Sequence, residues 1–366
     1  MKTDKIAIAH PEMTEEMIEA ASAALRNERL VMGESVFKFE EEFAKYCGVK
    51  HAISVSSGTD ALSLAMIALD LKGKEVLTTP LSFIATANTV VHAGGKPVFC
   101  DADPVDNNID IKAAAKVKGK KIKAILPVHL FGHPCDMDAM MDLAQERDWF
   151  VIEDACQAHG AEFKGKKVGD IGTVGCFSFY PTKNMTVGGD GGMVTTNDEK
   201  LAKDVAKLRD CGRVSRYLHD VVGYTSRLNT CNAAIGRIQL RHLDQWNDRR
   251  REIAKLYTKL LKGTDGVMVP PSPDKKKTPV YHLYAIKVKG RDQLAAKLSE
   301  AGIDTAVHYP VPIHLQPAYK DVRGFKEGDY PVAERSSSTL MSLPIYPSLT
   351  NDQVKRVAET IKKLVK

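Results

Sequence analysis

The sequence predicts an α/β protein with a mainly parallel sheet in a large domain and a smaller α+β domain at the C-terminal end. Between about residues 50 and 200, short apolar, β-rich runs alternate with stretches of helical period, which is typical of a parallel sheet covered by helices on both faces. After a long amphipathic helix and a Pro-rich stretch, the chain continues as strand, helix and strand. The 366 residues suffice for two domains, which we place at residues 1–250 and 251–366.

The expected elements follow in order along the chain. A first strand ends near Val55 and a helix starts near Thr59, and further strands are predicted for EVLTTP, KPVFCDAD, KAILPVHLFG, WFVIEDA and GCFSF. The long helix is LDQWNDRRREIAKLYTKLLKG; in the second domain, strands at YHLYAIKVKG and TAVHYP flank a helix at RDQLAAKLSEAGI. The last helix begins at a cap, Thr350 or Asn351. Ligands of such sheets bind where strands end and helices begin, so functional residues are expected there.

Composition argues against several classes of function. The net charge of +6 is modest, and no nucleic-acid-binding module is present, so no nucleic acid partner is expected. No apolar run approaches the roughly 20 residues that span a bilayer, and the start lacks a signal-peptide core, so we predict a cytoplasmic protein without a membrane partner. The seven cysteines form no CxxC pair, which indicates neither a disulfide framework nor a metal site.

The segment SVSSGTDAL is a candidate phosphate site. A strand meets a helix there through a small, hydroxyl-rich turn at Ser57, Gly58 and Thr59. Such a turn directs free backbone N–H groups, the helix dipole and hydroxyls at one point, as a phosphate requires. An ordinary Ser/Gly turn with an N-cap explains the same residues.

An acid and an amine follow at the ends of two later strands. Asp154 ends the apolar strand WFVIED, where it could also be a structural cap, and Lys183 follows another apolar strand in a polar, Gly-rich context. A lysine placed there is desolvated and reactive. Pyridoxal phosphate (PLP) chemistry needs an amine for the Schiff base, a carboxylate for the pyridine nitrogen and a cup of donors for the phosphate. These three parts predict a PLP enzyme.

The chain resembles the DegT/DnrJ/StrS family of sugar aminotransferases, which are PLP transferases of fold type I. The likeness covers nearly the whole chain and rests on several motifs in the right order: MGESVFKFEEEFAKYCGVKHAISVSSGTDAL, EDACQAHGAEFKGKKVGDIG, SFYPTKN, VGYTSRL, AVHYPVPIHLQPAY and SLPIYPSLTNDQ.

The resemblance implies a role for each matching residue. Lys183 is the catalytic residue that carries the cofactor, Asp154 pairs with the pyridinium nitrogen, and Gln157 lies against the ring hydroxyl. Phe83 stacks on the ring, unless it is an ordinary core residue. The residues of the phosphate cup are Ser57, Gly58, Thr59 and Ser178.

The family pattern usually has Asn within G-Y-N-S-R, where it reaches the phosphate across a dimer interface. This chain has Thr225 there, which keeps one hydrogen-bond donor, so a shorter contact is expected. The motif implies a homodimer with shared active sites. Arg227 is expected to bind either an anionic group of the substrate or an acidic neighbour. Residues resembling those near the sugar are His159, His308, Tyr309 and His314. For the histidines, a structural role is the alternative.

The implied reaction moves an amino group from an amino acid, L-glutamate by resemblance, through the pyridoxamine phosphate form of the cofactor to a keto-sugar. The lysine loop FYPTKN…GGDGG favours an activated 3-keto sugar over a 4-keto sugar. The alternatives are an eight-carbon keto-sugar acid as substrate, a sugar dehydratase, and a non-catalytic regulatory protein of the same fold. The dehydratases resemble this chain with His in place of Lys183, which argues against them.

Overall fold

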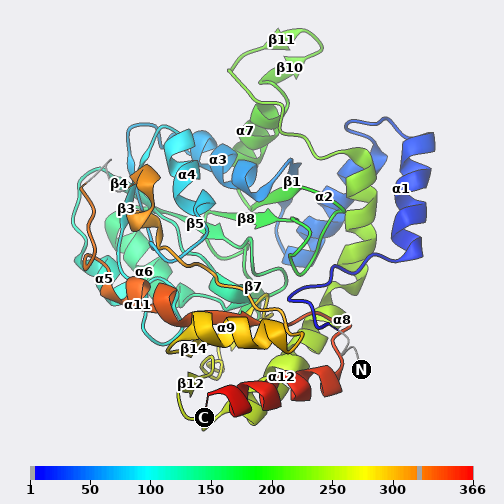
Figure 1. The fold of residues 1–366 in the computed structure, drawn as a ribbon. Coiled ribbons are helices and arrows are strands. Elements are labelled where there is room, and N and C mark those ends of the chain that lie inside the picture. Colours follow the sequence, from blue (N-terminus) through cyan, green and yellow to red (C-terminus); the bar gives the residue numbers. More distant parts are fainter. Residues whose placement is uncertain (1–4, 320–323, 366) are drawn as a thin grey trace.

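A seven-stranded sheet forms the centre of the molecule (Figure 1), of which the computed structural model describes residues 5–319 and 324–365. The strand order is β1-β9-β8-β5-β4-β2-β3. The strands are β1 (His51–Val55), β2 (Glu75–Thr78), β3 (Lys96–Phe99), β4 (Ile122–Ile125), β5 (Phe150–Asp154), β8 (Val174–Ser178) and β9 (Gly192–Thr196). From β8 to β3 all neighbours are parallel, and β9 runs antiparallel to β1 and β8. The predicted fold class is therefore confirmed.

Helices cover both faces of this sheet, because its strands carry apolar side chains on both sides. One face packs on α3 (Gly58–Ala68), α4 (Ala85–His92) and α7 (Glu199–Arg209). The other packs on α2 (Glu34–Cys47), α5 (Ile111–Lys116), α6 (Met137–Arg147) and the first half of α8 (Thr230–Leu261). Successive residues of a strand point to opposite faces. In β5, Ile152 therefore joins the core beneath α3, and Val151 joins the core beneath α6.

A second, smaller sheet forms the C-terminal part and has the order β12-β14-β15. Its elements are β12 (Val267–Met268), β14 (Tyr284–Val288), β15 (Leu340–Leu343), α9 (Arg291–Glu300), α11 (Pro331–Thr339) and α12 (Asn351–Leu364). The last helix begins as expected, because the Thr350 hydroxyl accepts a hydrogen bond from the Gln353 N–H and the Gln353 side chain accepts one from the Thr350 N–H. The core of this C-terminal part also contains Ile6 and side chains from the second half of α8. The division predicted at residue 250 thus falls inside one continuous helix.

The predicted strand at TAVHYP is wrong. Only Ala306 forms a bridge there, with Ser342 of β15, and no strand extends over residues 305–310. Pro310 and Pro312 lack the N–H groups that a ladder requires, so pairing could not extend past residue 309. The segment instead leaves the sheet edge and carries His308 and Tyr309 toward the large domain.

The remaining elements are short, apart from α1 (Glu15–Asn27), which packs along α8 (Figure 1). The hairpin of β10 (Arg213–Ser215) and β11 (Leu218–His219) projects from the body beyond α7 (Figure 1). The others are β6 (Glu162–Phe163), β7 (Lys166–Lys167), β13 (Lys277–Thr278), η1 (Leu130–Gly132) and η2 (Ile313–Leu315). Among the helices of the described residues, none combines the length and apolar character that a bilayer crossing requires.

Candidate active site

A cavity of about 460 Å³ opens where β5 and β8 end and α3 begins. Its volume lies within the roughly 300–1,000 Å³ common for small-molecule sites, and its position is where parallel sheets bind ligands. Its lining residues are Ser57, Gly58, Thr59, Leu62, Ser82, Phe83, Ala85, Thr86, Asp154, Cys156, Gln157, Ser178, Tyr180, Thr182, Lys183, Asp190, His282, His308 and Tyr309. The structure therefore brings together most of the residues expected from the sequence.

The N-terminus of α3 forms one end of the cavity. Ser57 is its N-cap, and the Ser57 hydroxyl accepts a hydrogen bond from the Asp60 N–H at 3.0 Å. The first amides of a helix, here those of Gly58 and Thr59, have no intrahelical partner and carry the positive end of the helix dipole. A Cβ on Gly58 would lie 2.6 Å from the Ser178 Cβ, so only glycine lets α3 approach β8 this closely. The arrangement can bind an anion such as a phosphate.

Asp154 is buried at the end of β5, with its carboxylate held by its own chain. The Thr86 hydroxyl donates to Oδ2 at 2.9 Å, and the Cys156 N–H donates to Oδ1 at 3.3 Å. Ser82 and Thr86 share a hydrogen bond of 2.8 Å between their hydroxyls. The carboxylate is therefore fixed at the cavity wall in one orientation.

Lys183 follows β8 in a turn closed by its own N–H, which donates to the Tyr180 carbonyl at 2.9 Å. Desolvation lowers the pKa of its amine below the ordinary value, and nearby Cys156 and Asp154 offset this only in part. A lower pKa leaves more of the amine unprotonated at neutral pH, and the unprotonated amine is the nucleophile. Lys183 and Asp154 line the same cavity, as the sequence analysis requires.

Gln157, which follows β5, and Tyr309, from the C-terminal part of the chain, are in direct contact. The Gln157 side-chain amide donates to the Tyr309 hydroxyl at 3.2 Å, and its oxygen accepts from the Phe131 N–H at 2.7 Å. Burial raises the pKa of Tyr309, so the phenol keeps its proton. The Phe83 ring centroid lies 5.8 Å from that of Tyr309, and Phe83 is an exposed side chain at the cavity, not an ordinary core residue.

Two histidines reach the cavity from the C-terminal part. Burial lowers the pKa of His308 to about 4, and its Nδ1 lies 2.9 Å from the Ser342 hydroxyl. Burial also lowers the pKa of His282 well below its ordinary value, and His282 Nδ1 is buried with no partner among the described residues. Both rings are therefore neutral at pH 7.

Four of the expected residues lie outside this cavity. Thr225 is exposed, with its hydroxyl 3.4 Å from the Cys211 sulfur, and Arg227 pairs with Asp210 at 2.5 Å. His159 is buried, and the centroid of its ring lies 5.4 Å from that of one Phe ring and 5.7 Å from that of another. The His314 ring is buried, 3.0 Å from the Glu334 carboxylate. Arg227 thus contacts an acidic neighbour, and the two histidines have structural surroundings in this chain.

Several cavity residues were not predicted from the sequence. Thr86 stands three residues after Phe83, in the first turn of α4, and that spacing could have found it. His282 and Asp190 carried no such signal. His282 stands in a segment that reads as an ordinary apolar strand, and Asp190 stands in one that reads as an ordinary Gly-rich loop.

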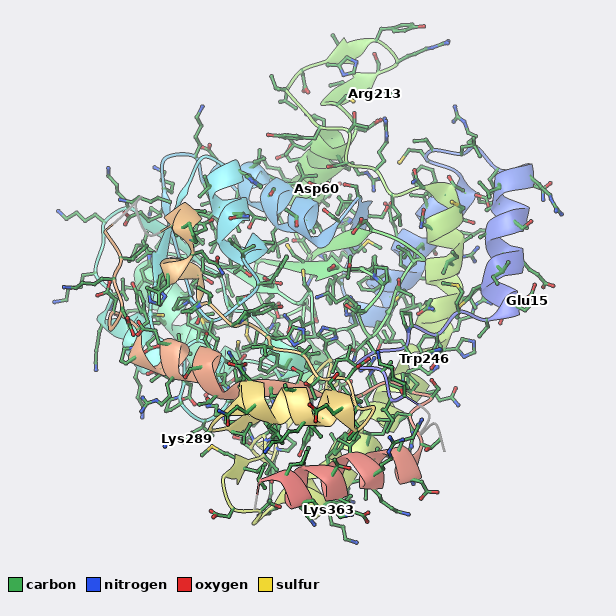
Figure 2. All side chains as sticks on the ribbon, viewed as in Figure 1. Glu15, Asp60, Arg213, Trp246, Lys289 and Lys363 are labelled. Carbon is green, nitrogen blue, oxygen red and sulfur yellow. The ribbon has the colours of Figure 1, made fainter. Side chains whose placement is uncertain are left out.

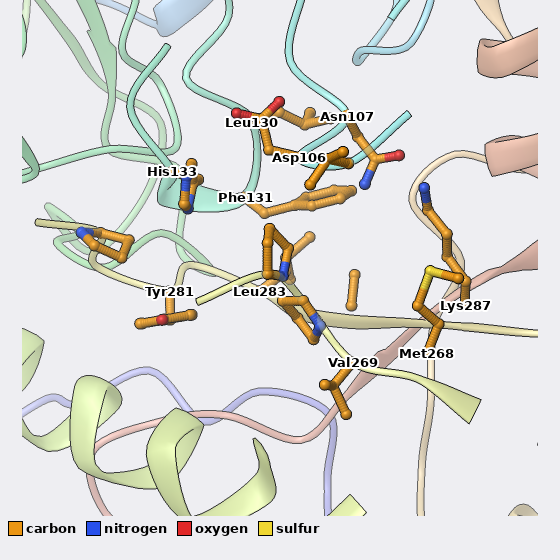
Figure 3. A pocket seen from close by; sticks show the side chains of 15 residues that line it. Asp106, Asn107, Leu130, Phe131, His133, Met268, Val269, Tyr281, Leu283 and Lys287 are labelled. Atoms are coloured by element: carbon orange, nitrogen blue, oxygen red, sulfur yellow. The ribbon is translucent and has the colours of Figure 1, made fainter. Parts of the chain in front are cut away.

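A second, smaller hollow lies beside Phe131 (Figure 3). Leu130, Phe131, Val269 and Leu283 form its apolar surface, and Lys287 stands at its edge. Its volume of about 40 Å³ has room for water only, so it is no alternative site for a cofactor.

Comparison with known proteins shows to which family the chain is similar. Residues 11–362 match the model of the DegT/DnrJ/EryC1/StrS aminotransferase family. The chain is 42% identical to a "pleiotropic regulatory protein" of Geobacillus stearothermophilus, over 96% of this chain and 95% of that protein. It is 40% identical to a dTDP-3-amino-3,4,6-trideoxy-alpha-D-glucose transaminase of Streptomyces venezuelae, over 97% of this chain and 93% of the enzyme.

The solved structures include one that superposes over the whole chain. It is the crystal structure of DesV from S. venezuelae in complex with a ketimine intermediate, with a TM-score of 0.96, 38% identity, and coverage of 100% of this chain and 99% of that one. Family model, sequence relatives and superposition agree over nearly the full length. The chain therefore belongs to the DegT/DnrJ/EryC1/StrS aminotransferase family.

Proposed function

We propose that this aminotransferase binds PLP and moves an amino group from an amino acid, L-glutamate by family resemblance, to a nucleotide-linked keto-sugar. The observation that carries the proposal is the shared cavity, in which Lys183, Asp154 and the N-terminus of α3 face one space. The product would be an amino-sugar for a surface polysaccharide or related glycan.

The residues around the cavity fit PLP. The closely packed N-terminus of α3, with Ser57, Gly58 and Thr59, offers amide and hydroxyl donors to a phosphate, and Ser178 adds a hydroxyl. Asp154 is an acceptor for a protonated ring nitrogen, and Lys183 is the amine to which the cofactor is joined. Gln157 would contact the ring hydroxyl, and exposed Phe83 offers a face on which the ring can lie.

Each side chain has a defined task in this proposal. When bound, PLP supplies the electron sink that stabilises negative charge on the reacting carbon. Asp154 keeps the ring nitrogen protonated, and its hydrogen bonds from Thr86 and Cys156 prevent it from turning away. Lys183, released by the incoming amino group, carries the proton between the reacting carbons, for which its lowered pKa suits it. Tyr309 and neutral His308 offer hydrogen bonds to the sugar.

The position that receives the amino group is proposed to be carbon 3. The lysine loop favours it, and the S. venezuelae relative is named as a 3-amino-sugar transaminase. A panel of keto-sugars added to the pyridoxamine form tests this: a 3-keto nucleotide sugar should restore the PLP absorption fastest. A faster response to a 4-keto sugar or to an eight-carbon keto-sugar acid would reassign the substrate.

The catalytic assignment is tested with Lys183→Ala. The variant should fold and still take up PLP non-covalently, because the phosphate cup remains, yet transamination should fall to background. Full turnover in the variant would contradict the role of Lys183. A wild-type protein that stays colourless with PLP, and does not bleach on addition of L-glutamate, would instead favour a regulatory protein, as the G. stearothermophilus relative is named.

We also propose that the chain acts as a homodimer with shared active sites. The hairpin of β10 and β11 projects from the body with its side chains spread outward (Figure 2). Tyr217 in the hairpin and Val222 just after it are 83% and 92% exposed. Apolar side chains this exposed favour a protein contact. Thr225, a few residues after the hairpin, is exposed and does not line the cavity of its own chain, so we propose that it approaches a partner's phosphate site.

A further inference from the structure

Beneath the proposed cofactor site lies a buried acid that the reaction does not use. Glu153 precedes Asp154 in β5 and points to the opposite face of the sheet. Its side chain is fully buried, as is that of His129, and the His129 Nε2 lies 3.0 Å from the Glu153 Oε2. A buried ion or hydrogen-bonded acid is costly, so its surroundings must compensate for the lost water.

The hydrogen bonds define the protonation state of the pair. The Cys135 N–H donates to the His129 Nδ1 at 3.1 Å, so that nitrogen carries no proton. The proton of a neutral His129 ring then resides on Nε2, which donates to Glu153. Glu153 also accepts from three backbone amides: Gly169 at 2.9 Å, Ile171 at 2.9 Å and Gly172 at 2.7 Å. Four donors facing two oxygens indicate an ionised carboxylate beside a neutral imidazole.

The electrostatics agree with an ionised Glu153. Burial raises the pKa of Glu153, but the hydrogen bond and the electrostatic attraction from His129, together with the hydrogen bonds from Gly169 and Gly172, outweigh it and hold the pKa below its ordinary value. The thiols near Glu153, Cys47, Cys135 and Cys176, have pKa values raised by burial and stay neutral.

Residues 129–131, which include the Glu153 partner His129, also form hydrogen bonds with two residues of the proposed cofactor site. The His129 backbone N–H donates to the Asp154 carbonyl at 3.1 Å, and two residues later the Phe131 N–H donates to the Gln157 side chain at 2.7 Å. The Leu130 N–H between them is held by Asn108 at 3.0 Å. The position of residues 129–131 therefore sets the backbone of Asp154 and the side chain of Gln157 together.

We propose that ionised Glu153 and neutral His129 form a positioning pair that fixes Asp154 and Gln157 against the ring of the bound cofactor. Glu153 draws the loop of residues 169–172 and His129 onto the far face of β5, and residues 129–131 transmit that position to the cavity side. The inference rests on the proposed function, because it gives the pair a purpose only if a PLP ring lies in the cavity.

The test compares Glu153→Gln with Glu162→Gln. Glu162 lies outside the network and pairs with partly exposed Lys167, so the control makes the same chemical change elsewhere. Glutamine at 153 has one acceptor oxygen, so it leaves some of the four donors unpaired. Binding of PLP to the cofactor-free protein should weaken about tenfold, by analogy with residues that hold the ligands of metal sites. The pH at which the absorption of bound PLP changes should also shift. Glu162→Gln should alter neither.

A second pair of variants keeps the inference testable if Glu153→Gln does not fold. His129→Gln retains a donor for Glu153 and should keep PLP binding close to wild type, whereas His129→Leu removes the donor and should weaken binding. The inference is overturned if Glu153→Gln lowers the melting temperature but binds PLP like Glu162→Gln, or if the two His129 variants bind PLP alike. A wild-type protein that takes up no PLP would refute the proposed function itself.

Discussion

A substitution at Asp154 can test the proposed chemistry without disturbing the local structure. Thr86 donates to its carboxylate, but a hydroxyl can also accept, so an amide at position 154 can keep this contact. We therefore expect Asp154→Asn to fold and to retain PLP. Its turnover should fall by about a hundredfold or more, because a neutral amide does not hold the ring nitrogen protonated. Wild-type turnover, measured with saturating L-glutamate, would refute the electron-sink role.

The buried histidines predict how stability depends on pH. Burial lowers the pKa of His159 to about 3 and that of His308 to about 4, below the ordinary 6.5. Below pH 6.5 the unfolded chain takes up protons that the folded chain does not, so stability should fall as the pH drops from about 6.5 to about 3. Each unit of lowered pKa corresponds to about 1.4 kcal/mol of the free energy of unfolding.

Urea unfolding of the cofactor-free protein at neutral and mildly acidic pH measures this effect. His159→Phe removes one titrating group from between two Phe rings and should make the loss in acid less steep. His92→Gln changes an exposed histidine and should leave the slope unchanged. Parallel slopes for wild type and His159→Phe would contradict the assignment.

At the scale of secondary-structure elements, the places where helices begin were the most predictable part of the structure. The β1 to α3 junction and the Thr350 cap follow from local residue chemistry, because a cap or a turn is satisfied by its immediate neighbours. The missing strand at residues 305–310 depends instead on long-range pairing, because beyond the single bridge from Ala306 to Ser342 the segment leaves β15. Glu153 was equally hidden, since its donors come from residues 129 and 169–172, far along the chain. Patterns of neighbours cannot specify such long-range partners.

The contact of α3 with β8 gives a prediction of its own. Alanine usually favours a helix by about 1 kcal/mol over glycine, but a Cβ at position 58 would meet the Ser178 Cβ at 2.6 Å and the Cys156 sulfur at 2.9 Å. Gly58→Ala should therefore push α3 away, widen the phosphate cup, and weaken PLP binding by about tenfold or more. Adding Cys156→Ala should recover part of the loss, and Cys156→Ala alone serves as the control. Unchanged PLP affinity in Gly58→Ala would contradict the tight approach.

At the scale of the whole molecule, the question is whether each active site contains residues of both chains of the proposed dimer. Thr225 is exposed, and it lies outside the cavity of its own chain. If it serves the partner's phosphate cup, Thr225→Asp should repel the phosphate there while leaving its own Lys183 intact. Lys183→Ala has the reverse defect. Each homodimer should be inactive, for a different reason.

Mixing the two variants after dissociation creates mixed dimers in which one site is whole. That site takes Lys183 from the Thr225→Asp chain and Thr225 from the Lys183→Ala chain. Random pairing makes about half of the dimers mixed, each with one good site of two, so activity should return to about a quarter of wild type. If Thr225 acts within its own chain, no mixed dimer contains an intact site and the mixture stays inactive. Activity of the mixture therefore distinguishes a shared site from two independent ones, and sedimentation of each variant confirms that dimers form.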